Sequence, residues 1–161
     1  MNKEFIIIFF HSIINCLKKY LVFKGRANRA EFWSFTLFYY LIVVICFSPY
    51  YFPFIEHKLE ILAINNYKPL NTYTEQFLFI GIIVSSVFYC PYLAVKTRRL
   101  HDINQSGYWI VAVFFLIALG RVFGEIGVYF LILSLILQIS ILILCVKPGD
   151  KKKNKFGKPS K

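Results

Sequence analysis

The chain has 161 residues, of which 58% are hydrophobic and only 17% are charged, and its formal net charge is +11. A typical soluble domain has about 25% charged residues and about 45–50% apolar ones. The composition therefore excludes a soluble enzyme, a disulfide-bonded secreted domain and a disordered chain, and it indicates a membrane protein.

Residues 1–24 are predicted to form an amphipathic helix that lies in the membrane interface. Asn15, Lys18 and Lys19 recur near one face of this helix, and apolar residues occupy the rest of it. The alternative is a cleaved signal peptide, because the apolar run 5–10 follows a lysine. No small-x-small cleavage motif follows this run, and polar residues interrupt it, so the interfacial helix is favoured.

Four uncharged segments follow, and each is predicted to be a transmembrane helix, because about 20 apolar residues cross a bilayer. The predicted spans are about 32–52, 77–95, 108–122 and 126–146. The fold class is thus an all-α membrane protein, in which four transmembrane helices (25–146) are preceded by an amphipathic interfacial N-terminal helix. The segment between the first two spans, 53–76, is expected to be a long periplasmic loop.

The third span is the shortest. Only thirteen uncharged residues, Tyr108 to Gly120, precede Arg121, and as a helix they would cover about 20 Å. Either the helix continues past Arg121, which then reaches the outer interface, or it forms a re-entrant hairpin with the fourth span. We favour the full span. Gly120, Gly124 and Gly127 fit a tight helical hairpin in both cases.

Residues 147–161 are predicted to be a basic cytoplasmic tail. Its seven lysines, with two glycines and two prolines, favour a segment that is disordered or that lies along lipid head groups. Of the 19 Lys and Arg residues, sixteen fall in the two tails and in the segment between the second and third spans. Because positive residues are retained in the cytoplasm, both termini are expected there, in a multi-pass protein of the bacterial inner membrane.

The four cysteines give no sign of a metal site or a disulfide. Cys16, Cys46, Cys90 and Cys145 show no C-x-x-C spacing. Free thiols in a membrane behave as small apolar residues. We therefore expect no metal and no cofactor, and the uneven charge distribution argues for membrane topology rather than for a nucleic-acid partner.

A first polar cluster, residues 23–33, precedes the first predicted span. Asn28 can cap the helix, and Glu31, three residues later, can return a hydrogen bond to the amide of the cap. Trp33 suits the head-group level. This structural interpretation leaves Arg26 and Arg29 as topology signals alone.

A second polar cluster, residues 96–109, follows the second predicted span. Pro91 is expected to kink that helix and to free the carbonyl of Val87. Ser106 is placed to cap the third helix. A purely structural interpretation, positive residues on the inner side and a tight turn, is open here as well.

The two clusters are predicted to meet, because the first two spans can pack antiparallel. Arg98, Arg99 and His101 suit the negative end of a helix, whereas Asp102 does not unless an arginine holds it. We expect at least one ion pair that joins Glu31 or Asp102 to an arginine of the other cluster. Examples are Arg29 with Asp102 and Glu31 with Arg98 or Arg99.

These segments carry a resemblance to a known family. F-K-G-R-x-x-R-x-E-F-W, then P-x-L-A-V-x-x-R-R-L-H-D and S-G-x-W, resemble a bacterial inner-membrane family known as domain of unknown function 805. The resemblance covers about Tyr20 to Gly157. Asn28 departs from the pattern, which usually has Ser or Thr there. The resemblance implies a small multi-span membrane protein, and it supplies no catalytic residues.

The functional hypothesis is a non-enzymatic membrane protein whose basic cytoplasmic face binds anionic phospholipid or a partner protein, including a second copy of the chain. The candidate binding residues are Lys24, Arg26, Arg29, Arg98, Arg99 and His101, with Glu31 and Asp102 as ion-pair partners. The alternative is a small oligomeric transporter or channel component, although no span has a carboxylate at mid-depth. In an enzyme, His101 and Asp102 would be base and orienting acid, but sequence neighbours on a helix do not face each other.

Overall fold

The structure is a computed structural model that describes residues 3–64 and 72–159. The regular secondary structure of this part of the chain is helical, apart from one isolated bridge between Asn154 and Gly157. The five helices are α1 (Lys3–Lys18), α2 (Arg29–Ile64), α3 (Thr72–Asp102), α4 (Tyr108–Val122) and α5 (Gly127–Val146). The all-helical class is as predicted.

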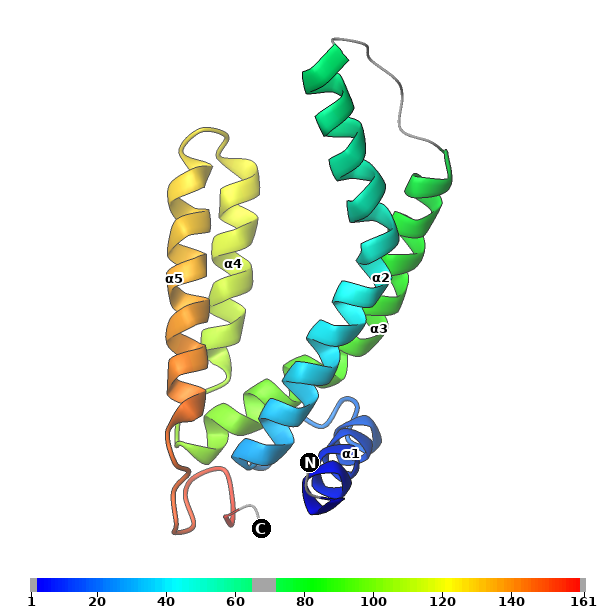
Figure 1. Ribbon diagram of the computed structural model, residues 1–161. Coiled ribbons are helices and arrows are strands. Elements are labelled where there is room, and N and C mark those ends of the chain that lie inside the picture. The colour runs from blue at the N-terminus through cyan, green and yellow to red at the C-terminus, as the bar shows by residue number, and fades with distance from the viewer. Residues whose placement is uncertain (1–2, 65–71, 160–161) are drawn as a thin grey trace.

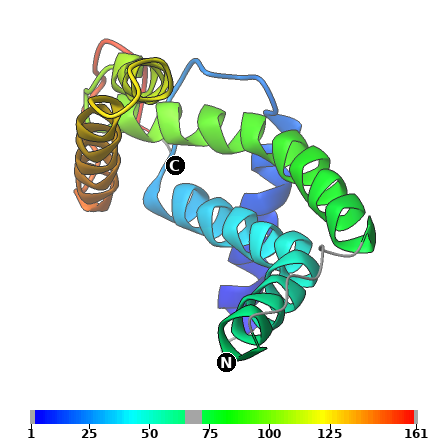
Figure 2. The same ribbon diagram turned by 90° about the horizontal axis from the view of Figure 1, so that it is seen from above.

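The helices form two antiparallel pairs. α2 packs along α3, and α4 packs along α5 (Figure 1). α3 also contacts α5, so that α3 connects the two pairs, and α1 lies across the ends of α2 and α3 (Figures 1 and 2). α1, the α3–α4 loop and the C-terminal segment share one end of the molecule, at the bottom of Figure 1, which we call the lower end.

Three helices are long and apolar enough to cross a membrane. The qualifying segments are Arg29–Pro49, Leu78–Asp102 and Gly127–Val146. α4 has the predicted bounds of the third span, but its 15 residues cover only about 22 Å, less than a hydrocarbon core of about 30 Å. Large apolar side chains such as Leu41, Ile83 and Ile136 are exposed along these helices, as expected of surfaces that face lipid.

The segment between the first two spans is not the loop that the sequence suggested. α2 continues through Pro53 to Ile64, and α3 begins at Thr72. Residues 65–71 lie outside the described part of the chain. Glu and Lys are good helix formers, so the charged residues after Phe52 mark the end of the apolar span and not the end of the helix. With 36 residues, α2 measures about 54 Å and extends well beyond one hydrocarbon core.

The turn between α4 and α5 is the predicted glycine hairpin. A Cβ atom on Gly127 would lie 2.2 Å from the carbonyl oxygen of Gly120, so only glycine lets the two backbones touch. Gly124 has a φ of +53°, a left-handed conformation that favours glycine.

The buried core lies at the lower end, where α1, α2, α3 and α5 converge. Phe32, Phe35, Val95, Leu100 and Ile141 are almost completely buried there. Charged residues are buried in the same region. The described core of this membrane protein is thus partly ionic.

Candidate functional site

Five charged residues from the two sequence clusters form one buried group, which we call the arginine cluster. Its members are Arg26, Glu31, Arg98, Arg99 and Asp102. Arg98 is 1% exposed and Arg99 is fully buried. Buried charges are tolerated when they are paired and hydrogen-bonded, so the partners of each residue decide what this cluster can do.

Arg98 and Glu31 join α3 to α2. Nη1 of Arg98 lies 2.8 Å from Oε1 of Glu31, the kind of pair that the sequence predicted. Glu31 is positioned by the predicted cap, because its backbone N–H donates to Oδ1 of Asn28 at 2.7 Å. Its carboxylate, which the capping motif suggested would bond the Asn28 amide, is instead directed at Arg98.

The thiol of Cys16 brings α1 to the same carboxylate. Its Sγ donates to Oε1 of Glu31 at 3.7 Å. Burial, with the nearby Glu31 charge, raises the pKa of Cys16 to about 12, so the thiol stays protonated and remains a donor at neutral pH. α1 is thereby fixed to the start of α2.

Asp102 is shared by two arginines. Its Oδ1 lies 2.8 Å from Nε of Arg26, and its Oδ2 lies 2.5 Å from Nη1 of Arg99. The suggested pairing of Asp102 with Arg29 is therefore wrong, because the arginine of the first cluster that pairs with Asp102 is Arg26. The backbone N–H of Ala27 donates to the carbonyl of Arg98 at 3.0 Å, which holds the segment before α2 against α3 and directs Arg26 inward, whereas Arg29 is exposed.

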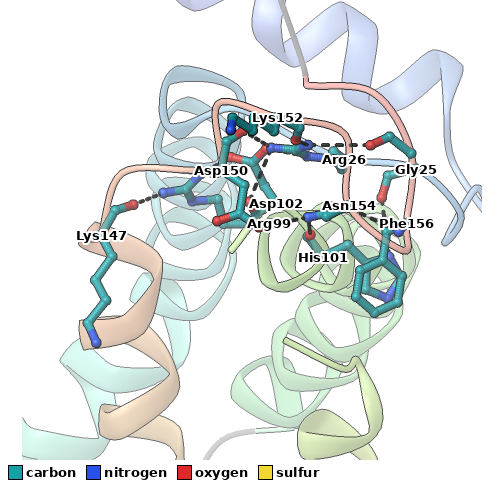
Figure 3. A network of polar contacts seen from close by, with 11 residues as sticks. Gly25, Arg26, Arg99, His101, Asp102, Lys147, Asp150, Lys152, Asn154 and Phe156 are labelled. Carbon is teal, nitrogen blue, oxygen red and sulfur yellow. Dashed lines mark hydrogen bonds and ion pairs between the residues drawn. The ribbon is translucent and has the colours of Figure 1, made fainter. Parts of the chain in front are cut away.

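The C-terminal segment completes the arginine cluster through backbone carbonyls (Figure 3). The Arg26 guanidinium donates to the carbonyls of Lys152 at 2.9 Å, of Gly157 at 3.4 Å, and of Asp150. Arg99 donates to the carbonyls of Cys145, at 3.1 Å, and Lys147.

Of the two predictions for the tail, disorder is therefore wrong, because the tail is folded onto the ends of α2 and α3. The sequence could not show this, because the acceptors are main-chain carbonyls, which every residue has.

Side chains of the tail reinforce this docking at His101. Phe156 stacks on the imidazole ring with centroids 3.8 Å apart, and Nδ2 of Asn154 donates to the His101 carbonyl at 2.9 Å. Nδ1 of His101 lies 3.2 Å from the carbonyl of Gly25, so this nitrogen is the one that bears hydrogen. A Cβ on Gly149 would lie 1.9 Å from Oδ2 of Asp102, which shows how closely the tail approaches.

Pro91 leaves the unpaired carbonyl that the sequence predicted, and a distant residue satisfies it. The hydroxyl of Tyr20, after α1, donates to the carbonyl of Val87, four residues before the proline. At the other end of the α3–α4 loop, Oγ of Ser106 accepts from the N–H of Tyr108 at 3.3 Å. The N-cap position itself is occupied by Gly107.

The candidate binding residues thus separate into two sets. Arg26, Arg98 and Arg99 are buried and ion-paired within the arginine cluster. His101 is half-buried beneath Phe156. Only Lys24 and Arg29 of the predicted residues are exposed. Further exposed cations belong to the segments that share the lower end. We call the whole exposed set the basic collar: Lys18, Lys19, Lys24, Arg29, Lys147, Lys151, Lys152, Lys153, Lys155 and Lys158.

Metal-binding residues do not gather in the described part of the chain. In residues 3–64 and 72–159, no group of three His, Cys, Asp or Glu side chains could hold a metal ion. The four cysteines are free thiols, with Cys16 and Cys145 buried. The contacts that the arginine cluster makes are ion pairs and hydrogen bonds.

Comparison with known proteins places these features in a shared framework. A family model described as "Protein of unknown function (DUF805)" matches residues 20–158. The inner membrane protein YhaH of Escherichia coli is 34% identical over 104 residues, which cover 65% of this chain and 71% of YhaH. The inner membrane protein YhaI of the same organism is 29% identical over 101 residues, covering 63% and 69%. No solved structure matches. The family match includes the arginine cluster and the docked tail and leaves out α1.

Proposed function

The chain belongs to the DUF805 family of proteins of unknown function, and from this premise we propose that it is a non-enzymatic, multi-pass protein of the bacterial inner membrane that binds anionic phospholipid through its basic collar. In this proposal α2, α3, α4 and α5 all cross the bilayer, and the lower end faces the cytoplasm. The excess of Lys and Arg at that end supports this orientation.

The observation that carries the proposal is the separation of the cations by burial. The charges of Arg26, Arg98 and Arg99 are offset by two carboxylates and by backbone carbonyls inside the protein. The charges of the basic collar are exposed around the same helix ends. Each Lys or Arg near an anionic leaflet contributes about 1 kcal/mol of attraction, so ten such residues favour an anionic surface strongly.

The docked tail gives the collar a fixed position. Arg26 and Arg99 bond backbone carbonyls within residues 145–157. The lysines of this segment are therefore kept beside the ends of α2 and α3. The arginines of the cluster pair with carboxylates of the same cluster. This pairing supports a structural rather than a catalytic role for the cluster.

The test is lipid binding by the full-length protein in nanodiscs. We compare phosphatidylethanolamine alone with phosphatidylethanolamine mixed with phosphatidylglycerol, and measure the lipids retained on the protein by native mass spectrometry. The triple variant Lys151→Gln, Lys152→Gln, Lys153→Gln should retain less phosphatidylglycerol, because three exposed charges are lost while the docking carbonyls remain. Lys→Arg at the same positions is the matched control. Equal retention of the two lipids by the unaltered protein would refute the proposal.

A further inference from the structure

Arg29 is the one arginine of the two sequence clusters whose side chain is exposed. It lies in the first turn of α2, and within the described residues it makes no ion pair. Two cavities adjoin it, one apolar and one polar, and Arg29 lines both. A guanidinium between an apolar and a polar cavity matches the layout of an amphiphilic ligand.

The apolar cavity has a volume of about 440 Å³ and lies between three helices. Ile8 and Phe9 come from α1, Trp33 and Leu37 from α2, and Val146 from the end of α5. Both views of the ribbon show the first turn of α2 between α1 and the lower end of α5 (Figures 1 and 2). The walls are hydrocarbon and aromatic, which suits an acyl chain.

The polar cavity has a volume of about 340 Å³ and carries a surplus of positive charge. Arg29, Arg99 and Lys151 line it, and so do Asp102 and Asp150. Arg99 and Asp102 are already paired with each other, and Oδ2 of Asp150 accepts from Asn154. Arg29 and Lys151 therefore supply the cations for a ligand, and arginine is well suited to bind a phosphate with two parallel hydrogen bonds.

We propose that Arg29 holds the phosphate of one resident anionic phospholipid, whose acyl chain fills the apolar cavity and whose head group extends toward Lys151. This inference rests on the proposed function and deepens it. The collar attracts anionic lipid in general, whereas Arg29 retains one molecule at a defined place. That molecule also fills the space between the lower end of α5 and the α1–α2 corner.

A second apolar cavity provides an internal comparison. It has about 430 Å³ and lies between α3 and α4, with Leu93, Val111 and Phe114 in its walls. No arginine or lysine lines it. This cavity is similar in size to the one beside Arg29 but has no lysine or arginine in its walls, so we expect it not to select anionic lipid. Substitutions in it therefore show what the filling of an apolar cavity does by itself.

The experiment measures the phosphatidylglycerol that stays on the full-length protein after delipidation, by native mass spectrometry. The unaltered protein should retain one molecule. Arg29→Gln should lower the retained fraction by about tenfold, because the loss of one charge-assisted contact weakens binding by roughly that factor. Arg29→Lys should keep part of the binding. Arg121→Gln removes an exposed arginine charge that lies outside the collar and outside both cavities, and it should leave retention unchanged.

Two further arms test the apolar half and the identity of the ligand. Ser34→Phe fills the apolar cavity without a change of charge and should also release the lipid, whereas Val111→Phe in the comparison cavity should not. A phosphatidylglycerol with a photoreactive acyl chain should crosslink the unaltered protein within 29–37. Inorganic phosphate should not displace this lipid, because free phosphate has no acyl chain to fill the apolar cavity. Displacement would indicate a site for phosphate alone.

The outcomes distinguish the inference from the proposed function. If the unaltered protein shows no preference for phosphatidylglycerol, both fail. If it shows the preference but Arg29→Gln behaves like Arg121→Gln, or if the crosslinks fall elsewhere, the inference alone fails. Displacement by inorganic phosphate would likewise overturn it. Because the crosslinking arm uses the unaltered protein, the result does not depend on the folding of any variant.

Discussion

Arg98 and Arg99 are consecutive residues of α3, yet they connect it to different parts of the protein. Arg98 bonds Glu31 at the start of α2, whereas Arg99 bonds Asp102 and the carbonyls of Cys145 and Lys147 at the end of α5. Adjacent residues on an α-helix point about 100° apart, which explains how one dipeptide reaches two directions. The tandem arginines therefore attach α3 to both helix pairs at once.

The pair of Glu31 with Arg98 should be essential for stability. Glu31→Arg places two guanidinium groups together in a buried site, and we expect a loss of about 3–5 kcal/mol in the free energy of unfolding. Adding Arg98→Glu restores opposite charges and should recover part of the loss. Thermal unfolding in detergent measures both variants, with Lys24→Glu, at an exposed site, as the control. A double variant no more stable than Glu31→Arg would contradict the pairing.

For individual residues, the sequence predicted the kinds of contact better than it predicted which residues make them. The cap at Asn28 and an ion pair between the clusters follow from residue types and spacing. The choice of Arg26 over Arg29 as the partner of Asp102 does not, because the path of the chain before α2 decides it. The carbonyl acceptors of the tail were also missed, since no side-chain pattern marks them.

Among the elements, α3 depends on a residue far from it in sequence. Pro91 lacks the N–H that would bond the Val87 carbonyl, and the Tyr20 hydroxyl bonds it instead. Tyr20 belongs to the segment between α1 and α2. The carbonyl that Pro91 leaves without a helical partner thus provides an attachment point for the N-terminal part of the chain.

A double-mutant cycle should show this coupling. Tyr20→Phe removes only the hydroxyl and should cost about 1–2 kcal/mol in the unfolding free energy, because a carbonyl loses its partner. In the background Pro91→Ala, the new amide at position 91 can bond the Val87 carbonyl, so the same substitution should cost less. Thermal unfolding of the four proteins gives the interaction energy. Equal costs in both backgrounds would exclude the coupling.

The docked tail makes its own prediction at Gly149. Gly149→Ala places a methyl group where the Asp102 carboxylate lies, so the tail should detach from the arginine cluster. The amides of Asp150, Asn154 and Gly157 donate hydrogen bonds in the docked state, and their hydrogen exchange should become at least about tenfold faster. Lys151→Ala, at an exposed site, is the control. Fast exchange of these amides in the unaltered protein would contradict the docking.

The element boundaries show where the limits of sequence interpretation lie. The predicted spans agree with the helices at Tyr108 and at Val146, where glycines or a proline also mark the helix ends. They miss the end of α2, because hydropathy marks where a helix leaves the membrane, and a helix of good formers continues into water.

For the whole molecule, the arrangement separates the two ends by charge. α1, the segment between α1 and α2, the end of α3 and the docked tail gather at the lower end (Figure 1), and these segments contain most of the positive residues. The opposite end has the α4–α5 turn, the end of α2 and the start of α3. This is the asymmetry that the positive-inside rule requires of an even number of spans.

Reporter insertions test the number of spans and the orientation together. A reporter fused after Lys161 should be active in the cytoplasm, and one inserted within 65–71 should be active in the periplasm. An insertion within 123–126, the exposed turn after α4, is also expected in the periplasm, because α4 and α5 would both cross. A cytoplasmic signal from 123–126 would show that α4 does not cross, and a periplasmic signal after Lys161 would reverse the orientation.

The contacts of Arg26 also impose an order of events on biosynthesis. Its carbonyl partners in Asp150, Lys152 and Gly157 lie 124 to 131 positions further along the chain, so they leave the ribosome only after α5 has been made. Until then, the loop that contains α2, α3, α4 and α5 is open, and closing it carries the entropic cost of a long-range contact. Arg26, near the start of the family-matched region, thus completes its set of native contacts last, when its most distant partners have been made.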